Sequence, residues 1–311
     1  MKILGISGGT KNGRNDSMVI EALMGAKEAG AEIEFIHLRD LNLKYCTGCN
    51  ACAAAMEMGK GSVCTIRDDD FEWLLDKMLD ADGILFSMPI FNNCAPAIYH
   101  TLMDRMGPRF DKGMFINCIK IAEENGKTIE DQRMLNPKVV SFMSVGGSDW
   151  STSVENEFIL HAACDMWTIV QNEVFQWAAT LVMDEERMAK VHQIGVNLAN
   201  AAKDMENAKY LSEPGICDIC NSHHIRFSAD GTAICAGCGT VGKVEVVDGA
   251  YKFVYTPEEG ALAHNTLTGK AKHSEDIGNS FMKQAHILFS DEYKEKLESY
   301  ASFIQPTVPN K

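Results

Sequence analysis

The chain has 311 residues, 46% of them hydrophobic and 23% charged, which is the composition of a globular protein with a substantial core. Its 29 basic and 43 acidic residues give a formal net charge of −14, which opposes non-specific binding to nucleic acid or anionic membranes and favours a small-molecule partner. No apolar run approaches the roughly 18 residues that span a bilayer, and "MKILGISGG" reaches glycines before a signal-peptide core, so we expect a cytoplasmic protein.

Short apolar segments alternate with amphipathic ones over much of the chain. The expected strands cover residues 2–7, 31–38, 83–89, 138–145 and 168–175. Helices are expected at residues 17–29, from 68, near 95–106, from about 152, and at 184–206. Strands that alternate with helices predict an α/β fold, with a doubly wound parallel sheet and helices on both faces. Residues 109–136 fit no such helix and look like an insertion.

The remainder of the chain is organised differently. The proline and glycine of "LSEPG", residues 211–215, indicate a linker, and a cysteine-rich segment with strand-like flanks follows it. We therefore predict a sheet domain over residues 1–210, a small second domain over 211–256 and a polar tail over 257–311. A helix is expected in the tail near residues 274–303.

Ligands of parallel sheets bind beyond the carboxyl ends of the strands, so the loops at that edge are the first place to look for a site. The first loop reads "SGGTKNGRNDS", residues 7–17, and lacks both the dinucleotide and the P-loop fingerprints. It offers backbone amides at Gly8 and Gly9, several hydroxyls, a lysine and an arginine ahead of a helix N-terminus, which suits a monophosphate. The alternative is a plain strand-to-helix turn with Ser17 as the N-cap.

Two further loops belong to the same edge. In "SMPIFNN", residues 87–93, Pro89 fixes the turn and Phe91 supplies an aromatic edge. In "SVGGSDW", residues 144–150, two glycines let the backbone approach a ligand closely. We expect all three loops to open on one rim and to share one ligand.

The succession of "SGGTKNGRNDS", "MPIFNNCAPAIYHTLMDR" and "VGGS" resembles the flavodoxin-like NAD(P)H-dependent FMN reductases, a family that includes the iron-sulfur flavoproteins, over about residues 1–205. The resemblance implies a flavodoxin-like five-stranded sheet, FMN as cofactor, NAD(P)H as co-substrate, and a homodimer or higher homo-oligomer. The residues that it implies for the FMN phosphate are Ser7, Thr10, Lys11, Asn15 and Ser17. Those that it implies for the isoalloxazine ring are Pro89, Ile90, Phe91 and Asn92 along one border, with Gly146, Gly147 and Ser148 on the pyrimidine side.

The first loop departs from the family at one position. Where the family commonly has Asn before the Ser or Thr that opens the first helix, this chain has Asp16. A carboxylate beside a phosphate dianion is unfavourable unless it turns away to cap the helix.

A first cysteine cluster lies between the second and third predicted strands and consists of Cys46, Cys49, Cys52 and Cys64. Two successive C-x-x-C spacings with a fourth cysteine downstream can supply four thiolates to a [4Fe-4S] cluster, and the iron-sulfur flavoproteins have a similar motif with a shorter final gap. The alternative is a set of reduced thiols in a loop or at a subunit contact. Cys94, Cys118 and Cys164 are isolated, and we expect them to be small core residues.

A second cysteine cluster has the spacing C-x2-C-x14-C-x2-C and consists of Cys217, Cys220, Cys235 and Cys238. Four thiolates at this spacing suit tetrahedral Zn²⁺, and four protein ligands leave no open position for a substrate, so the site is predicted to be structural. Zinc of this kind stabilises small units that lack a full core. The pattern resembles zinc ribbons and, less closely, rubredoxin, so iron is the alternative.

His223 and His224 lie inside this segment, but the thiolate set is complete without them, and we interpret them as exposed loop histidines. Residues 211–256 carry a net charge of −2, which argues against a nucleic-acid partner. Contact with a second subunit, or cover for the flavin rim, fits this domain better.

These features predict an FMN-dependent NAD(P)H oxidoreductase that passes hydride or electrons to a small quinone, azo, nitro or enone acceptor. No side-chain acid or base is assigned, and Asp149, Trp150 and the 109–136 insertion are candidates for the acceptor pocket. One alternative is an iron-sulfur flavoprotein that carries electrons between protein partners. Another is a non-catalytic binding or sensing module that uses the cysteine-rich domain as its partner surface.

Overall fold

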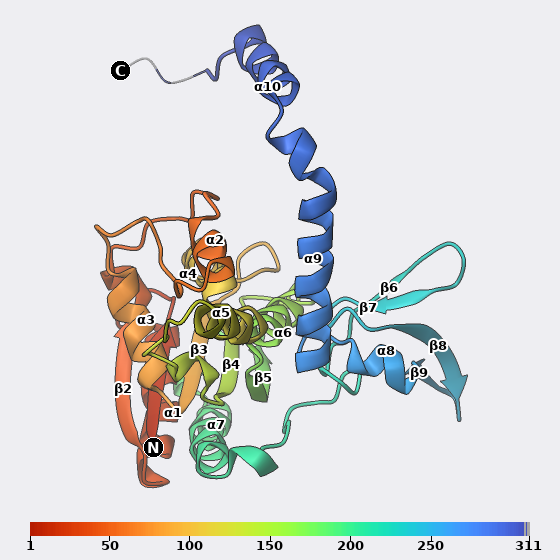
Figure 1. Ribbon diagram of the computed structural model, residues 1–311. Coiled ribbons are helices and arrows are strands. Elements are labelled where there is room, and N and C mark those ends of the chain that lie inside the picture. Colours follow the sequence, from red (N-terminus) through yellow and green to blue (C-terminus); the bar gives the residue numbers. More distant parts are fainter. Residues whose placement is uncertain (308, 310–311) are drawn as a thin grey trace. The chain divides into compact units, whose positions relative to one another are not determined.

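The computed structural model describes residues 1–307 and residue 309 (Figure 1). The chain divides into two units, Met1–Lys270 and Ala271–Lys311. The first unit contains a five-stranded sheet with its helices and a smaller four-stranded sheet. The second unit is helical.

The larger sheet consists of β1 (Lys2–Ser7), β2 (Glu32–His37), β3 (Gly83–Pro89), β4 (Val139–Val145) and β5 (Thr168–Phe175). Its strand order is β2-β1-β3-β4-β5, and every neighbouring pair is parallel. The order reverses between β1 and β3, and a crevice for ligands opens at such a switch point, at the carboxyl ends of the strands. The predicted flavodoxin-like doubly wound sheet is thus confirmed.

Helices cover both faces of this sheet (Figure 1). One face carries α1 (Arg14–Glu28) and α7 (Glu185–Lys203), and the other carries α3 (Phe71–Asp80), α4 (Ala97–Phe110) and α6 (Val154–Asp165). Successive strand residues point to opposite faces, so Ile3 joins the core under α1 and α7 while Leu4 and Ile6 join the other core. Because both faces are covered, the central strands are apolar almost throughout.

The helices α1 and α7 approach each other closely enough for their backbones to touch. A Cβ at Gly195 would lie 1.6 Å from the carbonyl oxygen of Ala22, and a Cβ at Gly25 would lie 2.2 Å from that of His192. Only glycine allows this approach, which holds the first loop of the sheet in place through α1.

The segment 109–136 is a helical layer, which the sequence analysis did not predict. After a break at Gly107 in α4, α5 (Lys112–Glu124) begins with the carboxylate of Asp111 accepting a hydrogen bond from the amide of Met114. Phe115 of α5 packs with Met56 of the short helix α2 (Ala51–Glu57) in a small separate core. The "GP" pair inside α4 hides this helix from a periodicity analysis, because it interrupts the apolar repeat.

The smaller sheet is antiparallel and consists of β6 (Ile225–Phe227), β7 (Ala233–Cys235), β8 (Val241–Val247) and β9 (Ala250–Val254). It is followed by α8 (Pro257–Ala261). The four cysteines of the second cluster and Phe253 form its core together with Ile159 of α6. This small cysteine-centred sheet has the fold of a zinc ribbon, as predicted.

The helix predicted near residues 274–303 is two helices, α9 (Leu267–Leu288) and α10 (Asp291–Phe303). They are separate because the hydroxyl of Ser290 accepts a hydrogen bond from the amide of Tyr293 and so caps the start of α10. Single 3₁₀ turns lie at Leu38–Asp40, Arg133–Leu135, Leu181–Met183 and Met205–Asn207. Within the described residues, no helix is both long and apolar enough to cross a membrane.

Candidate functional site

A pocket of about 680 Å³ opens where the strands of the larger sheet end. Three predicted loops line it: the loop after β1 through Thr10, Gly13, Arg14 and Asn15, the loop after β3 through Pro89, Ile90 and Phe91, and the loop after β4 through Val145, Gly146 and Gly147. Arg39, which follows β2, and Ala179, which follows β5, complete the lining. The volume lies within the range of about 300–1,000 Å³ that is common for cofactor sites.

Asp16 faces away from the ligand edge and organises the first loop from inside. Its carboxylate accepts hydrogen bonds from the hydroxyl of Ser7 at 2.5 Å and from the backbone amide of Asn12 at 2.6 Å. The ring of His37 lies beneath the same loop, with Nε2 3.2 Å from the carbonyl oxygen of Gly9 and 3.7 Å from the Asp16 carboxylate. Asp16 thus supports the loop and does not cap the helix, whose N-cap is Gly13, and the Ser7 hydroxyl is engaged inside the loop.

Two other residues implied for the phosphate lie outside the pocket lining. The ammonium of Lys11 bonds the carboxylate of Asp40 at 2.7 Å, and this bond lowers the pKa of Asp40. Ser17 lies inside α1, and its hydroxyl donates to the carbonyl oxygen of Gly13 at 3.1 Å. Because Gly13 is the N-cap, the alternative interpretation of Ser17 as the cap is wrong.

The lining of the pocket is cationic in a strongly acidic protein. Arg14 and Arg39 both line it, while none of its described lining residues is acidic. Arg14 donates one hydrogen bond to the carbonyl oxygen of Ala178 at 2.9 Å. In the described part of the chain, neither guanidinium has a carboxylate within the 4.0 Å of an ion pair. Two unpaired guanidinium groups beside a helix N-terminus attract an anion.

The loop that follows β4 leaves its backbone open to the pocket. A Cβ at Gly147 would meet no atom within 4 Å, and a Cβ at Gly146 would come 3.2 Å from Cδ1 of Ile90. The backbone of this loop is thus exposed to a flat ligand, with Ile90 and Phe91 on the neighbouring border. A planar molecule that bears a phosphate fits a pocket with an open glycine edge and a cationic lining.

The remaining two implied residues shape their loops and do not line the pocket. Asn92 adopts φ +51 in a tight turn whose flanking residues, Phe91 and Cys94, are joined by two backbone hydrogen bonds of 2.9 and 3.0 Å. The hydroxyl of Ser148 accepts a hydrogen bond from the amide of Trp150 at 3.2 Å.

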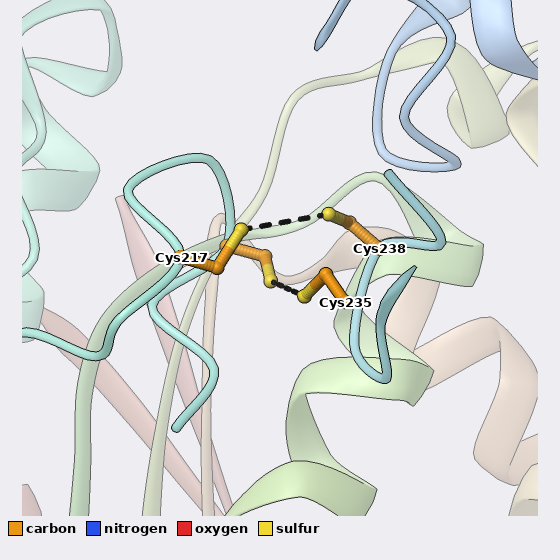
Figure 2. Close-up of side chains that lie close together, drawn as sticks. Cys217, Cys235 and Cys238 are labelled. Atoms are coloured by element: carbon orange, nitrogen blue, oxygen red, sulfur yellow. Dashed lines mark hydrogen bonds between the residues drawn. The ribbon is translucent and has the colours of Figure 1, made fainter. Parts of the chain in front are cut away.

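The second cysteine cluster converges on one point (Figure 2). The sulfur atoms of Cys217, Cys220, Cys235 and Cys238 all lie within 4.8 Å of one another, and all four residues are buried. Two Sγ–Sγ separations are 3.8 Å, for Cys217 and Cys238, and 3.5 Å, for Cys220 and Cys235 (Figure 2). A tetrahedral ion with metal–sulfur bonds of about 2.3 Å requires separations of about 3.8 Å, so the donor set fits zinc or iron.

The ribbon is attached to the loop that follows β4. Nε2 of His224 lies 2.7 Å from the carbonyl oxygen of Thr152, and the hydroxyl of Ser222 donates to the side-chain oxygen of Asn156 at 2.7 Å. His224 is thus engaged outside the thiol set but is half-buried, so the prediction of an exposed residue is wrong for it, whereas His223 is exposed as predicted. These two contacts tie the ribbon to the segment that joins β4 to α6 and to α6 itself.

Residues 1–179 match the sequence profile of the NADPH-dependent FMN reductases. The chain belongs to this family. A flavone reductase of known structure is 47% identical to it, with a TM-score of 0.88 and coverage of 100% of both chains. A flavone synthase from Aspergillus candidus is 26% identical over 295 residues, which cover 89% of this chain and 88% of that protein. An iron-sulfur flavoprotein from Methanocaldococcus jannaschii is 42% identical over 109 residues, 35% of this chain and 53% of that protein. The chain is accordingly an NAD(P)H-dependent flavin oxidoreductase.

This FMN reductase brings its first cysteine cluster to a second, smaller pocket of about 70 Å³, lined by Cys46, Cys49, Cys52 and Cys64 together with Arg105 and Arg109. Cys46 and Cys49 are exposed, whereas Cys52 and Cys64 are half-buried. A contact with the Thr65 hydroxyl lowers the pKa of Cys49, and burial raises that of Cys52. Four thiols around one pocket fit the donor set of an iron-sulfur cluster.

The two arginines beneath this pocket are buried and paired. Arg105 bonds the carboxylate of Asp69 at 2.6 Å, and Arg109 bonds that of Glu72 at 2.6 and 2.9 Å. Both guanidinium groups also stack on the ring of Phe71. These contacts tie α4 to α3, and further bonds from Arg105 to the carbonyl oxygen of Lys44 and from Arg109 to the hydroxyl of Ser62 hold the cysteine loop.

The isolated cysteines differ among themselves. Cys118 is fully buried in the small core under α5, as expected. Cys94 and Cys164 are only half-buried, and burial raises the pKa of Cys164 to about 12. None of the three belongs to either cluster.

Proposed function

We propose that this FMN reductase takes reducing equivalents from NAD(P)H through bound FMN and passes them to a small conjugated acceptor, of the enone class in the first place. The observation that carries the proposal is the pocket with a cationic lining and an open glycine edge, to which Arg14, Arg39 and Gly147 contribute. Full-length similarity to a flavone reductase favours an enone over a quinone, azo or nitro acceptor.

The residues of the pocket divide into two groups. At the loop after β1, the hydroxyl of Thr10 and the side chain of Asn15 would hold the phosphate, and the guanidinium groups of Arg14 and Arg39 would supply positive charge to the pocket. At the neighbouring loops, Pro89, Ile90 and Phe91 on one border and the two glycines after β4 would receive the ring. When bound, FMN supplies hydride transfer, and the chain supplies position, exclusion of water and backbone donors.

The overall reaction balances without a further reactant. NAD(P)H gives up a hydride, which carries two electrons and one proton, and a second proton comes from solvent. An enone acceptor gains these two hydrogens across its carbon–carbon double bond, and NAD(P)⁺ is released.

Zinc is the ion that we assign to the ribbon. Among the described residues the site gathers four cysteine sulfurs and no further histidine, cysteine or carboxylate donor, so a bound ion would have no open position and would be structural. Its attachment to Thr152 through His224 supports the view that the ribbon stabilises the pocket wall.

A second candidate function is electron transfer between protein partners through FMN and an iron-sulfur cluster. The convergence of four cysteines on one pocket favours it, as does the similarity to iron-sulfur flavoproteins. Iron and acid-labile sulfide analysis of anaerobically purified protein, with a Cys64→Ser variant beside it, separates the two functions. An electron carrier needs both elements, whereas the reductase does not.

The experiment that tests the main proposal is anaerobic oxidation of NADPH and of NADH by FMN-loaded protein with flavone, a quinone, an azo dye and a nitroarene as acceptors. We expect flavone to be reduced with one NAD(P)H consumed per product. If none of these acceptors increases NAD(P)H oxidation above the rate without acceptor, the proposed function is wrong.

A further inference from the structure

Three large aromatic side chains are exposed on the loops that follow three adjacent strands. Phe91 follows β3, Trp150 follows β4 and Trp177 follows β5, and their exposed fractions are 59%, 62% and 65%. Adjacent parallel strands end at the same edge of the sheet, so the three rings lie on the edge where the pocket opens.

Each ring is next to the pocket along the chain. Phe91 itself lines it, Gly147 lies three residues before Trp150, and Ala179 lies two residues after Trp177. The loops that carry the rings therefore border the mouth of the pocket.

The backbone of Trp177 is held in a conformation that does not suit its side chain. Its φ is +51, in the left-handed region, which costs an L-residue about 1–2 kcal/mol and is accepted most easily by Gly and Asn. The ring is exposed, so packing does not compensate for this cost. An exposed indole on a strained backbone indicates a role in binding more than in folding.

Hydrogen bonds fix the three loops to one another. Asn93, in the loop of Phe91, accepts a bond from the amide of Ser153 at 2.9 Å and donates to the hydroxyl of Thr152 at 3.1 Å. The side chain of Gln176 donates to the hydroxyl of Ser151 at 2.8 Å and so joins the two tryptophan loops. The rings are carried on a frame that is organised before any ligand arrives.

We propose that Phe91, Trp150 and Trp177 form an aromatic platform that binds the planar aromatic acceptor over the FMN site and selects it against acceptors without aromatic rings. This inference rests on the proposed function and names the substrate class, aromatic enones of two or three rings. Stacking on indole and phenyl faces recognises such molecules, and a non-aromatic enone of the same reactivity gains little from it.

The exposed area distinguishes a small ligand from a protein partner. Three aromatic side chains of 150–250 Å² each, about 60% exposed, offer a ligand at most about 450 Å² of accessible surface. A stable protein interface buries about 800 Å² of surface on each partner. A molecule the size of flavone needs a contact area of only a few hundred Å². The platform therefore fits a small molecule better than a second copy of the chain.

The test compares Trp177→Asn and Trp150→Ala with Trp73→Ala, which removes an exposed indole from α3, outside the pocket. Asn suits the backbone at 177, so this variant is expected to fold at least as well as the parent. Each rim variant should lower the ratio of kcat/KM for flavone to kcat/KM for cyclohex-2-enone by about tenfold. Flavone should also bind the oxidised FMN-loaded protein about tenfold more weakly, as measured by calorimetry without NAD(P)H.

Two results would overturn the platform. Equal losses for both acceptors would mean a structural role, and unchanged flavone binding with a smaller mass by light scattering would mean a subunit contact. The calorimetric measurement of flavone binding distinguishes failure of the platform from failure of the proposed function. Trp-dependent flavone binding without turnover rejects the function and supports the platform, whereas turnover that ignores both tryptophans supports the function and rejects the platform.

Discussion

The carboxylate of Asp16 accepts a hydrogen bond of 2.5 Å from the hydroxyl of Ser7. The two side chains of the loop after β1 thus bond each other instead of lining the pocket. Asp16 also accepts from the amide of Asn12, and both contacts are sheltered from solvent or nearly so. Asp16, the residue that departs from the family pattern, therefore stabilises the loop from inside through its carboxylate. It still lies on the same loop as Thr10 and Asn15, and its negative charge acts on any phosphate held there.

Asp16→Asn and Asp16→Ala should change FMN affinity in opposite directions. Asn keeps an oxygen acceptor for the Asn12 amide while removing the charge, so FMN should bind roughly fivefold more tightly. Ala leaves the amide and the Ser7 hydroxyl without their partner, so FMN should bind roughly tenfold more weakly. Quenching of flavin fluorescence measures both, and weaker binding by Asp16→Asn would show that the charge itself supports the loop.

Gly147→Ala should impair flavin binding and leave stability unchanged. The added Cβ meets no protein atom within 4 Å, so we expect Tm to change by less than about 2 °C. It projects from the loop edge that is proposed to receive the ring, so FMN should bind roughly tenfold more weakly. Gly278→Ala is the control, because its Cβ also meets open space but lies in α9. Equal FMN affinity for both variants would remove Gly147 from the site.

Much of this site is predictable because strand ends are recognisable in the sequence. Runs such as "GILFSMP" predict buried strands, and their succession predicts which loops share an edge. The contacts within a loop are not predictable in this way. Lys11 pairs with Asp40 and Ser17 donates to Gly13, so neither lines the pocket, although their residue types suit a phosphate.

Residues that the sequence analysis missed come from the outer strands. Arg39 and Ala179 follow β2 and β5, whose loops carry no glycine-rich motif to attract notice. Applying the rule for strand ends to all five strands would have included both of them. The positive φ of Trp177 has no sequence signal, because a bulky residue is the last choice for that conformation. Helix α5 was missed because the break at Gly107 interrupts the apolar repeat.

Cys235→Ser should remove the metal from the ribbon. Purified parent protein is expected to contain one zinc per chain, and the variant essentially none, because three thiolates bind far more weakly than four. Structural zinc contributes on the order of 10 kcal/mol to folding of such a unit, so limited proteolysis should then cut within residues 217–238. Cys164→Ser, at a cysteine outside the cluster, should keep full metal content. Iron in place of zinc would identify a rubredoxin-like centre.

His161 should make stability depend on pH. Burial lowers its pKa to about 4, with a further contribution from His100, and Nδ1 lies 2.9 Å from the hydroxyl oxygen of Tyr99. Because the folded pKa is below the unfolded value of 6.5, the neutral ring stabilises the fold above pH 6.5, and this contribution is lost as the pH falls toward 4. Between pH 7.5 and pH 5 the loss is about 2 kcal/mol.

Urea unfolding of the parent and of His161→Asn at these two pH values measures that loss. Asn keeps a polar partner for Tyr99 and does not titrate, so the difference in unfolding free energy between the two proteins should change by about 2 kcal/mol. Other titrating groups are shared and cancel. A difference that is independent of pH would mean that His161 titrates normally in the folded protein.

We propose that the pocket between the loops after β1, β3 and β4 binds FMN with its phosphate at the loop after β1, where Arg14 and Arg39 supply positive charge. Titration of flavin-free protein with FMN and, separately, with riboflavin tests it most directly. We expect the protein to bind one FMN per chain and to bind FMN at least tenfold more tightly than riboflavin. The preference for FMN over riboflavin should be smaller in the Arg14→Gln and Arg39→Gln variants. Equal affinity for the two flavins, or no binding of either, would contradict it.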